Sequence, residues 1–338
     1  MVRSDVHGSR REPMGRLRSA VEVDVSHVVA LPGRHIVRGV VVAASSPIPS
    51  GSPPLVWCCL PGGHCTSAYF DLHVEGDDTS YSMAAHLADA GGVVLALDHL
   101  GTGASSPVDD SFLVTPEVLA SANHAAFTAL IGRLQTGTLV SGLEPIAAPQ
   151  AIGLGHSMGA MITIIGQARY ETSAAVANLG GGGAGLPEHL HDPQWVSWDL
   201  ALLRTSLVEL ARQQFGGKTV DRARGRPGIF HADDVPAPVL GAFRSQLTTS
   251  LPSCALASIL PSFSEPERRE ISVPLFLGFG EHDLAQVPHE SVRSFCSSPD
   301  ITLFVLPGSG HCHNQAGNRQ RLWDRMVEWA RSSPLRIN

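Results

Sequence analysis

The pentapeptide Gly155-His156-Ser157-Met158-Gly159 places a serine between two glycines. This G-x-S-x-G pattern is typical of a nucleophile elbow, a tight strand-to-helix turn that exposes the serine Oγ. The same turn aims the N–H of the next residue, Met158, at the space in front of the serine. Glycines are expected on both sides because strand and helix backbones approach closely there, and a Cβ would collide. So short a pattern also arises by chance, so its surroundings must decide its meaning.

The residues that flank the pentapeptide favour an elbow. Residues 150–154 are apolar without alternation, which is typical of a strand in a parallel sheet covered on both faces. Residues 160–166 are apolar nearly all round, as in a buried helix. Strand, turn and helix therefore occur in the order that an exposed nucleophile requires. A serine with only a structural role in the turn is the alternative interpretation.

A serine hydroxyl is a poor nucleophile near neutral pH, so it needs a histidine base and a carboxylate that orients this base. Asp283 follows the apolar strand expected at residues 275–279, and Glu281 is the alternative acid. His311 follows the strand expected at residues 301–306 and a Gly-x-Gly turn, and His313 is the alternative base.

Further segments give the chain a resemblance to the α/β-hydrolase superfamily from about residue 21 to residue 330. Leu60-Pro61-Gly62-Gly63-His64 resembles the oxyanion loop after the third strand of that fold. Asp98-His99-Leu100-Gly101-Thr102-Gly103-Ala104-Ser105 resembles the D-x-R-G-x-G-x-S segment after the fourth strand. Leu100 replaces the usual arginine, and Pro61 stands where many members have histidine. The chain order of serine, acid and histidine is also that of the superfamily.

The resemblance implies a role for each candidate. It implies a triad of Ser157 as nucleophile, Asp283 as orienting acid and His311 as general base and acid. The N–H groups of Met158 and Gly63 would form the oxyanion hole, with His64 as the alternative second donor. Two such donors would stabilise the negative charge that develops on a carbonyl oxygen during attack.

The elements that must position these residues alternate along the chain. Apolar strands are expected at residues 55–60, 93–97, 150–154, 174–179, 273–279 and 301–306. Helices are expected at residues 81–90, 116–134, 160–166, 288–296 and 319–330. Two β-branched runs at 21–30 and 35–44 predict an antiparallel start. Strands interleaved with helices predict an α/β fold with a doubly wound, mostly parallel sheet.

The alternation stops between residues 184 and 266, where amphipathic stretches at 195–213 and 239–251 predict an inserted helical cap or lid. Sites in such folds lie beyond the carboxyl ends of the strands, so the cap is expected to cover the site. The expected organisation is a flexible tail at residues 1–20, a hydrolase core at 21–183 and 267–338, and the cap at 184–266.

His64 and two cap residues, Trp195 and Trp198, are the candidate substrate contacts. The tryptophans could instead form the core of the cap, and His64 could instead cap its turn. Three cap arginines in a Gly-rich loop are expected to be solvated, with recognition of an anionic substrate as the alternative: Arg222, Arg224 and Arg226. An apolar pocket of this kind favours a moderately bulky, apolar substrate.

Composition excludes several classes of protein. The 338 residues include 24 basic and 31 acidic ones and carry a net charge of −7, which disfavours nucleic-acid binding. No run of about 18 apolar residues occurs, so no membrane span is expected. Six cysteines are too few for a disulfide scaffold of this length, which indicates a reducing compartment, the cytoplasm. His311-Cys312-His313 has no matching pair at zinc spacing, so neither a metal nor another cofactor is expected.

The sequence therefore predicts a serine hydrolase that cleaves an ester or lactone of a small molecule through an acyl-enzyme. A C–C bond hydrolase, thioesterase or amidase with the same triad is an alternative, as is a ligand-binding protein of this fold without activity. Serine at the elbow disfavours the dehalogenase and epoxide hydrolase relatives, which use aspartate there. The pocket decides the substrate, so the sequence leaves the substrate open. It also leaves open the oligomeric state, with a homodimer as one alternative.

Overall fold

The structure is a computed structural model that describes residues 10–11, 15–45, 54–76, 78–216, 230–231, 234–284 and 287–333. Within these residues, one sheet contains the strands β1 (Arg10–Arg11), β2 (Arg16–Asp24), β3 (Ile36–Ala44), β4 (Leu55–Leu60), β5 (Val93–Leu97), β6 (Gln150–His156), β7 (Ala175–Leu179), β8 (Leu275–Gly280) and β9 (Ile301–Leu306). Their order is β1-β2-β3-β5-β4-β6-β7-β8-β9. Neighbours from β5 onward in this order are parallel, and the earlier pairs are antiparallel. The expected mostly parallel sheet with an antiparallel start is confirmed.

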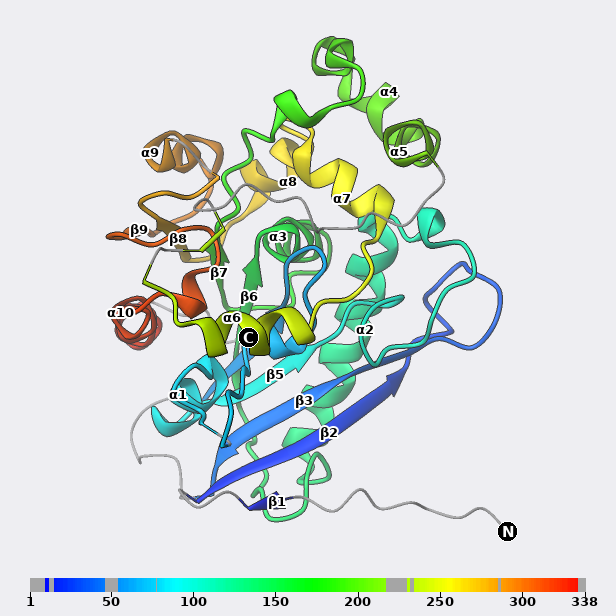
Figure 1. Cartoon of the computed structure of the whole chain (residues 1–338). Helices are drawn as coiled ribbons and strands as arrows, with labels where there is room; N and C mark the ends of the chain where they lie inside the picture. Colours follow the sequence, from blue (N-terminus) through cyan, green and yellow to red (C-terminus); the bar gives the residue numbers. More distant parts are fainter. Residues whose placement is uncertain are drawn as a thin grey trace.

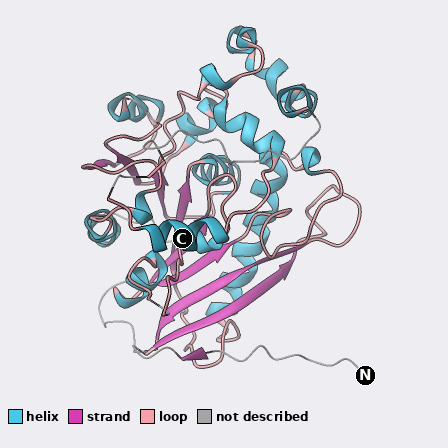
Figure 2. Ribbon diagram, viewed as in Figure 1, coloured by secondary structure: helices cyan, strands magenta, loops and turns pink. Residues whose placement is uncertain are grey.

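The helices lie on both faces of this sheet (Figure 1), and Figure 2 shows them surrounding the twisted strands. The core helices are α1 (Met83–Asp89), α2 (Pro116–Gln135), α3 (Met158–Tyr170), α9 (Pro288–Ser291) and α10 (Gln320–Ser332). Between β7 and β8 lie α4 (Leu200–Thr205), α5 (Leu207–Phe215), α6 (Ala237–Ser245), α7 (Pro252–Ile259) and α8 (Glu265–Glu270). The expected doubly wound α/β arrangement is therefore present.

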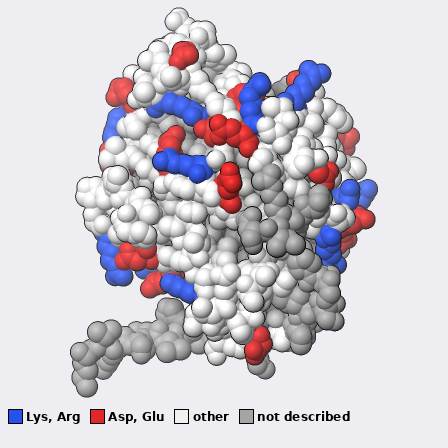
Figure 3. Space-filling view, turned by 180° about the vertical axis from the view of Figure 1, so that it is seen from behind, with Lys and Arg blue, Asp and Glu red and all other residues white. Residues whose placement is uncertain are grey.

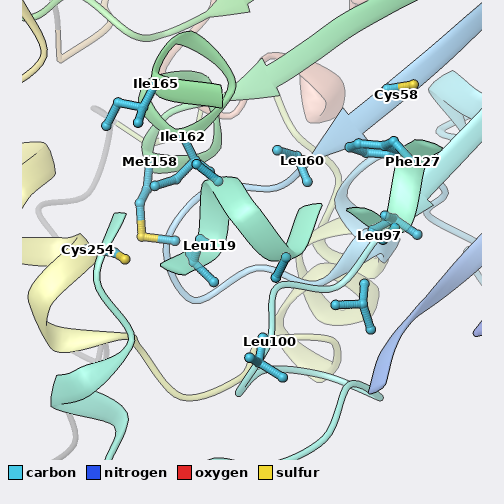
Figure 4. Packing of buried hydrophobic residues seen from close by; sticks show 14 of the residues in the cluster. Cys58, Leu60, Leu97, Leu100, Leu119, Phe127, Met158, Ile162, Ile165 and Cys254 are labelled. Carbon is cyan, nitrogen blue, oxygen red and sulfur yellow. The ribbon is translucent and has the colours of Figure 1, made fainter. Parts of the chain in front are cut away.

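The two faces of the sheet bury separate apolar clusters. Cys58 of β4 packs in the cluster that contains Phe127 of α2 and Ile162 of α3 (Figure 4). Its neighbour Trp57 packs on the opposite face, in the cluster that contains Leu87 of α1. Successive side chains of a strand point to opposite faces, so a strand covered on both faces is apolar throughout. This is why β4 and β6 are continuous apolar runs in the sequence.

The first strands correct two expectations. β2 begins at Arg16, so residues 16–20 belong to the sheet and not to a flexible tail; most of the preceding residues lie outside those described. β2 then ends at Asp24, well before residue 30. The Arg16 guanidinium donates to Asp89 at 2.8 Å, and Arg18 pairs with Asp71. The sequence does not reveal these contacts, because both partners are more than 50 residues away in the chain.

The segment between β7 and β8 is helical, as expected, but its helices are shorter than predicted. The stretch expected at 195–213 is divided into a short 3-10 helix, α4 and α5, and the stretch at 239–251 ends as helix at Ser245. In Figure 1, α4, α5, α7 and α8 lie on one side of α3, opposite the antiparallel strands. α7 contacts α2, α3 and α5, whereas α6 contributes Phe243 to the cluster on the other face. The segment therefore packs on both sides of the sheet's carboxyl edge.

The surface is mixed in charge. Figure 3 shows acidic and basic side chains interspersed on the face that it presents. Among the described helices, none combines the length and the apolar character that a membrane crossing requires. Arg222, Arg224 and Arg226 lie outside the described residues, so their expected solvation is not addressed by the structure.

All six cysteines are free thiols, and five of them are buried. Burial raises the pKa of Cys58 to about 12, and it raises the pKa of Cys59 and Cys254 well above the usual value. Cys296 is the exposed one. Because the thiolate is the reactive form, buried thiols with raised pKa values react slowly.

We predict that the native protein exposes one thiol to Ellman's reagent at pH 8 and that all six react in guanidinium chloride. Cys296→Ser should abolish the fast reaction and leave the slow ones unchanged. Absorbance at 412 nm measures both. Any fast thiol in the Cys296→Ser variant would contradict the burial of the others.

Candidate active site

Ser157 occupies a strained turn between β6 and α3. Its backbone has φ 55° and ψ −120°, a conformation that residues other than glycine rarely adopt. Its N–H donates to the Leu179 carbonyl of the neighbouring strand at 2.8 Å. Its own carbonyl accepts from Ala160 at 3.0 Å, which begins α3. Bonds to strand and helix thus hold the serine in a turn that would otherwise relax.

The two glycines of the pentapeptide are required by close backbone contact. A Cβ on Gly155 would overlap the carbonyl of Gly159 and the backbone of Ala160. A Cβ on Gly159 would overlap the carbonyl oxygens of Leu60 and Pro61. The turn at Ser157 therefore lies directly against the loop that follows β4.

We predict that Gly159→Ala lowers the free energy of unfolding by about 3 kcal/mol, because the new methyl group meets backbone atoms that cannot move aside. Gly166→Ala in the same helix is the matched control. Its Cβ would come no closer than 4.0 Å to Ala120, so this variant should gain roughly 0.5–1 kcal/mol from reduced chain entropy. Urea unfolding followed by circular dichroism measures both. Equal effects of the two substitutions would refute the packing argument.

Asp283 and His311 meet at the carboxyl ends of β8 and β9. The His311 Nδ1–H donates to Asp283 Oδ1 at 2.6 Å, and both side chains are buried. The backbone N–H groups of Leu284 and Gly280 donate to the same carboxylate at 2.7 and 3.1 Å. Glu281, the alternative acid, instead accepts from the Gly308 N–H at 2.8 Å on the surface.

His313, the alternative base, binds the other oxygen of the same carboxylate. Its Nε2–H donates to Asp283 Oδ2 at 2.7 Å, and its side chain is fully buried. Burial alone would raise the pKa of Asp283, but the charges and hydrogen bonds of His311 and His313 outweigh it and hold this pKa well below its usual value. His311 lines the cavity in front of Ser157, and His313 does not. The two histidines therefore share an acid but differ in access to a substrate.

His156 supports His311 from behind. Its Nε2–H donates to the His311 carbonyl at 2.9 Å, and its ring stacks on Tyr69 with centroids 4.1 Å apart. Burial lowers the pKa of His156 well below its usual value, so this ring is neutral near pH 7. The sequence gives no sign of this contact, because the two residues are 155 positions apart in the chain.

We predict that Asp283→Asn lowers the free energy of unfolding by about 3 kcal/mol at pH 7, since it removes a buried carboxylate from its partners. The pKa of Asp283 in the folded state lies below the usual 3.8. The stability that the carboxylate contributes is therefore complete above about pH 5, and it is lost as the pH falls below 3.8 toward the folded-state pKa. The difference between wild type and Asp283→Asn should therefore shrink below about pH 4.

Urea unfolding at pH 7, 5, 4 and 3 tests this expectation. Glu281→Gln is the matched control, because this nearby carboxylate is exposed; it should change stability by less than about 0.5 kcal/mol. A difference between wild type and Asp283→Asn that grows as the pH falls would reverse the sign and refute the assignment.

The expected oxyanion donors lie beside Ser157. Met158 is the first residue of α3, so its N–H has no acceptor one turn back in the helix. Gly63 and His64 line the same cavity as Ser157. A Cβ on Gly62 would come within 3.0 Å of the Ser157 Cβ, which places this loop immediately over the elbow.

His64 lines the cavity in front of Ser157. Its backbone carbonyl accepts from the Thr248 N–H at 2.9 Å, which joins the loop after β4 to the segment after α6. His64 has φ 64°, so the loop turns sharply at this residue. A residue of the inserted segment thus helps to hold His64 in the cavity wall.

The segment after β5 has a structural role. Asp98 accepts from the backbone N–H groups of Ser67 at 2.6 Å and Ala104 at 2.7 Å. Leu100, which replaces the arginine usual in the resembling family, is fully buried in the apolar core near Leu119 (Figure 4). The buried, apolar side chain of Leu100 therefore packs at the position where an arginine is usual.

A cavity of about 320 Å³ opens in front of Ser157 and His311. Its walls come from residues 180–186, from α7 and α8, and from aromatic residues of the inserted segment, among them Phe215 and Phe230. The expected contacts Trp195 and Trp198 do not line it. Trp195 is 2% exposed within the apolar cluster, and Trp198 packs against that cluster. The large apolar surface of these tryptophans stabilises the insertion itself, which corrects their assignment to the pocket.

Comparison with known proteins agrees with this geometry. A family model described as "Alpha/beta hydrolase family" matches residues 59–324, so the chain belongs to that family. No curated protein matches the chain.

Solved structures with the same fold include several hydrolases. An E-2-(acetamidomethylene)succinate hydrolase is 18% identical with a TM-score of 0.54, over 93% of this chain and 99% of the other. A monoacylglycerol lipase of Paleococcus ferrophilus is 18% identical with a TM-score of 0.56, over 83% and 96%. An esterase of Exiguobacterium antarcticum is 14% identical with a TM-score of 0.56, over 96% and 99%. At these identities the likeness shows the fold alone.

Proposed function

We propose that the protein is a serine hydrolase that cleaves an ester or lactone of a small molecule through a Ser157 acyl-enzyme. The observation that supports this most is the short bond between His311 and Asp283 beside a cavity that both His311 and the strained Ser157 line. A base that is oriented by a buried carboxylate, next to an exposed nucleophile, is the arrangement that acyl transfer requires.

The proposed reaction has two steps. Ser157 Oγ attacks the carbonyl carbon while His311 Nε2 takes the hydroxyl proton, and the negative charge on the carbonyl oxygen is stabilised by the N–H groups of Met158 and Gly63. The protonated His311 then gives this proton to the leaving alkoxide, which departs as the alcohol. Water next attacks the acyl-enzyme with His311 as base. The ester bond to Ser157 breaks, the serine oxygen takes the proton from His311, and the acid is released. Each N–H donor in such a hole contributes about 3 kcal/mol to catalysis.

The segment at 184–266 is proposed to act as the cap of this site. Phe215, Phe230 and Phe263 line the cavity from this segment, which supports an apolar part of the substrate. Its helices pack on both faces at the sheet's carboxyl edge, so the cap would select substrates by shape. The five buried thiols are consistent with a reducing compartment, for which we propose the cytoplasm.

We predict that a fluorophosphonate probe labels the wild type and that Ser157→Ala prevents labelling and lowers kcat on 4-nitrophenyl hexanoate by about 10⁴-fold or more. Ser297→Ala, in an exposed turn, is the matched control and should behave like wild type. Gel fluorescence and absorbance at 400 nm measure the two effects.

Each result that departs from this prediction has a distinct interpretation. A wild type that neither reacts with the probe nor cleaves esters, lactones, thioesters or amides would exclude a hydrolase and support a ligand-binding protein. Labelling together with turnover of a β-diketone but of no ester would instead support C–C bond hydrolysis. Labelling that persists in Ser157→Ala would refute the assignment of the nucleophile.

A further inference from the structure

A buried arginine of α8 lines the same cavity as Ser157. Arg268 is 2% exposed, and it is one of the cavity's wall residues. Its Nη2 donates to the Gly181 carbonyl at 2.9 Å, its Nη1 to the Gly182 carbonyl at 3.3 Å, and its Nε to Ser264 Oγ at 3.2 Å. A guanidinium has five N–H donors, so these three bonds leave two donors available.

Within the described part of the chain, no carboxylate lies within ion-pair distance of Arg268. Burial lowers the pKa of Arg268 to about 10, so the side chain remains charged near pH 7. Glu265 acts on it favourably from a distance, but the Glu265 carboxylate is bonded to Arg269 at 2.8 Å. A buried charge is costly unless it is paired, so an arginine in this position calls for an anion.

The run of glycines after β7 connects this arginine to His311. A Cβ on Gly180 would come within 2.8 Å of His311 Cε1, and a Cβ on Gly183 would come within 2.6 Å of the Arg268 guanidinium carbon. Four consecutive residues span at most about 11 Å between their first and last Cα atoms. Ser157, His311 and Arg268 also line one cavity of about 320 Å³, so a molecule bound in this cavity can contact both the serine and the guanidinium.

The other walls of the cavity carry no opposing charge. Among the described residues that line it there is no aspartate or glutamate, while His64 and His189 contribute polar nitrogen atoms. An anion that enters this cavity meets no negative side chain on the described walls. A Cβ on Gly183 would overlap the guanidinium, so this glycine allows the chain after β7 to pass directly against Arg268.

We propose that Arg268 binds a carboxylate of the substrate, so that the preferred substrates are esters that carry a negative charge, such as half esters of dicarboxylic acids. This inference rests on the proposed hydrolase function and names its substrate class. The planar guanidinium pairs with a carboxylate through parallel N–H bonds, which adds geometric selectivity to the attraction. The apolar walls from Phe215 and Phe263 would hold the methylene chain between the carboxylate and the ester.

The test uses matched pairs of substrates, a carboxylate and its methyl ester, that differ in charge. The acyl-side pair is mono-4-nitrophenyl adipate and its methyl ester. The alcohol-side pair is the hexanoate ester of 4-hydroxybenzoic acid and that of its methyl ester. We expect the wild type to prefer the anionic member of at least one pair, and Arg268→Gln to lower kcat/KM on this member by about 10- to 100-fold, mainly through KM.

A loss of activity on the anionic substrate alone shows that Arg268 binds the substrate, whereas a structural role of this side chain would affect both substrates. Arg268→Gln should change kcat/KM on the neutral member by less than about threefold, and Arg268→Lys should restore part of the preference for the anion. Arg269→Gln is the matched control, because this exposed neighbour pairs only with Glu265 in the described residues; it should leave both substrates unchanged.

The outcomes distinguish this inference from the function on which it rests. A wild type that cleaves the neutral esters without preference for either anion, or an Arg268→Gln variant that loses equal activity on both members, would overturn the inference and leave the hydrolase intact. A folded wild type that cleaves none of the four esters and resists the fluorophosphonate would overturn both.

Discussion

The rest of the site depends on the carboxylate of Asp283 and on the hydrogen bonds that it accepts. It is a buried charge that receives N–H donors from His311, His313, Leu284 and Gly280. These bonds join the loops after β8 and β9, and they determine which nitrogen of His311 faces the cavity. Without them an ionised carboxylate in this place would be strongly unfavourable. The two histidines thus stabilise the charge of the Asp283 carboxylate, and this carboxylate orients His311.

The elbow imposes a second constraint, which is steric. Ser157 is held at a positive φ, and Gly159 lies against the carbonyls of Leu60 and Pro61. Ser157, the first N–H of α3 and the loop after β4 are therefore brought together by backbone packing and not by side-chain bonds. The strain is held by the parallel sheet, because β6 lies between β4 and β7 and its neighbours cannot move apart without breaking the sheet.

The inserted segment completes the site from the other side. It contributes aromatic walls of the cavity, and its Thr248 N–H binds the carbonyl of His64, another wall residue. α8 adds Arg268, whose hydrogen bonds to Gly181 and Gly182 tie the segment to the end of β7. Under the proposed function, the core supplies the groups that cleave the substrate, Ser157 and His311, and the inserted segment supplies the wall residues that select the substrate.

The sequence by itself determined the features that depend on neighbours in the chain. The elbow follows from five consecutive residues, and the mostly parallel sheet follows from apolar runs separated by helices. The order of serine, aspartate and histidine also led to Asp283 and His311, which are hydrogen-bonded to each other, and to Ser157, which lines the same cavity as His311. These predictions succeed because turn geometry and strand burial are local requirements that restrict which residues occur.

Only the tertiary structure decided the contacts between distant segments. His313 shares Asp283 from 30 residues away, and Arg268 binds Gly181 from 87 residues away. Trp195 was assigned to the pocket because an aromatic residue of an insertion has the same appearance in sequence whether it faces a cavity or a core. Burial and pairing of such side chains depend on how the insertion packs on the sheet, and this packing has no local pattern in the chain.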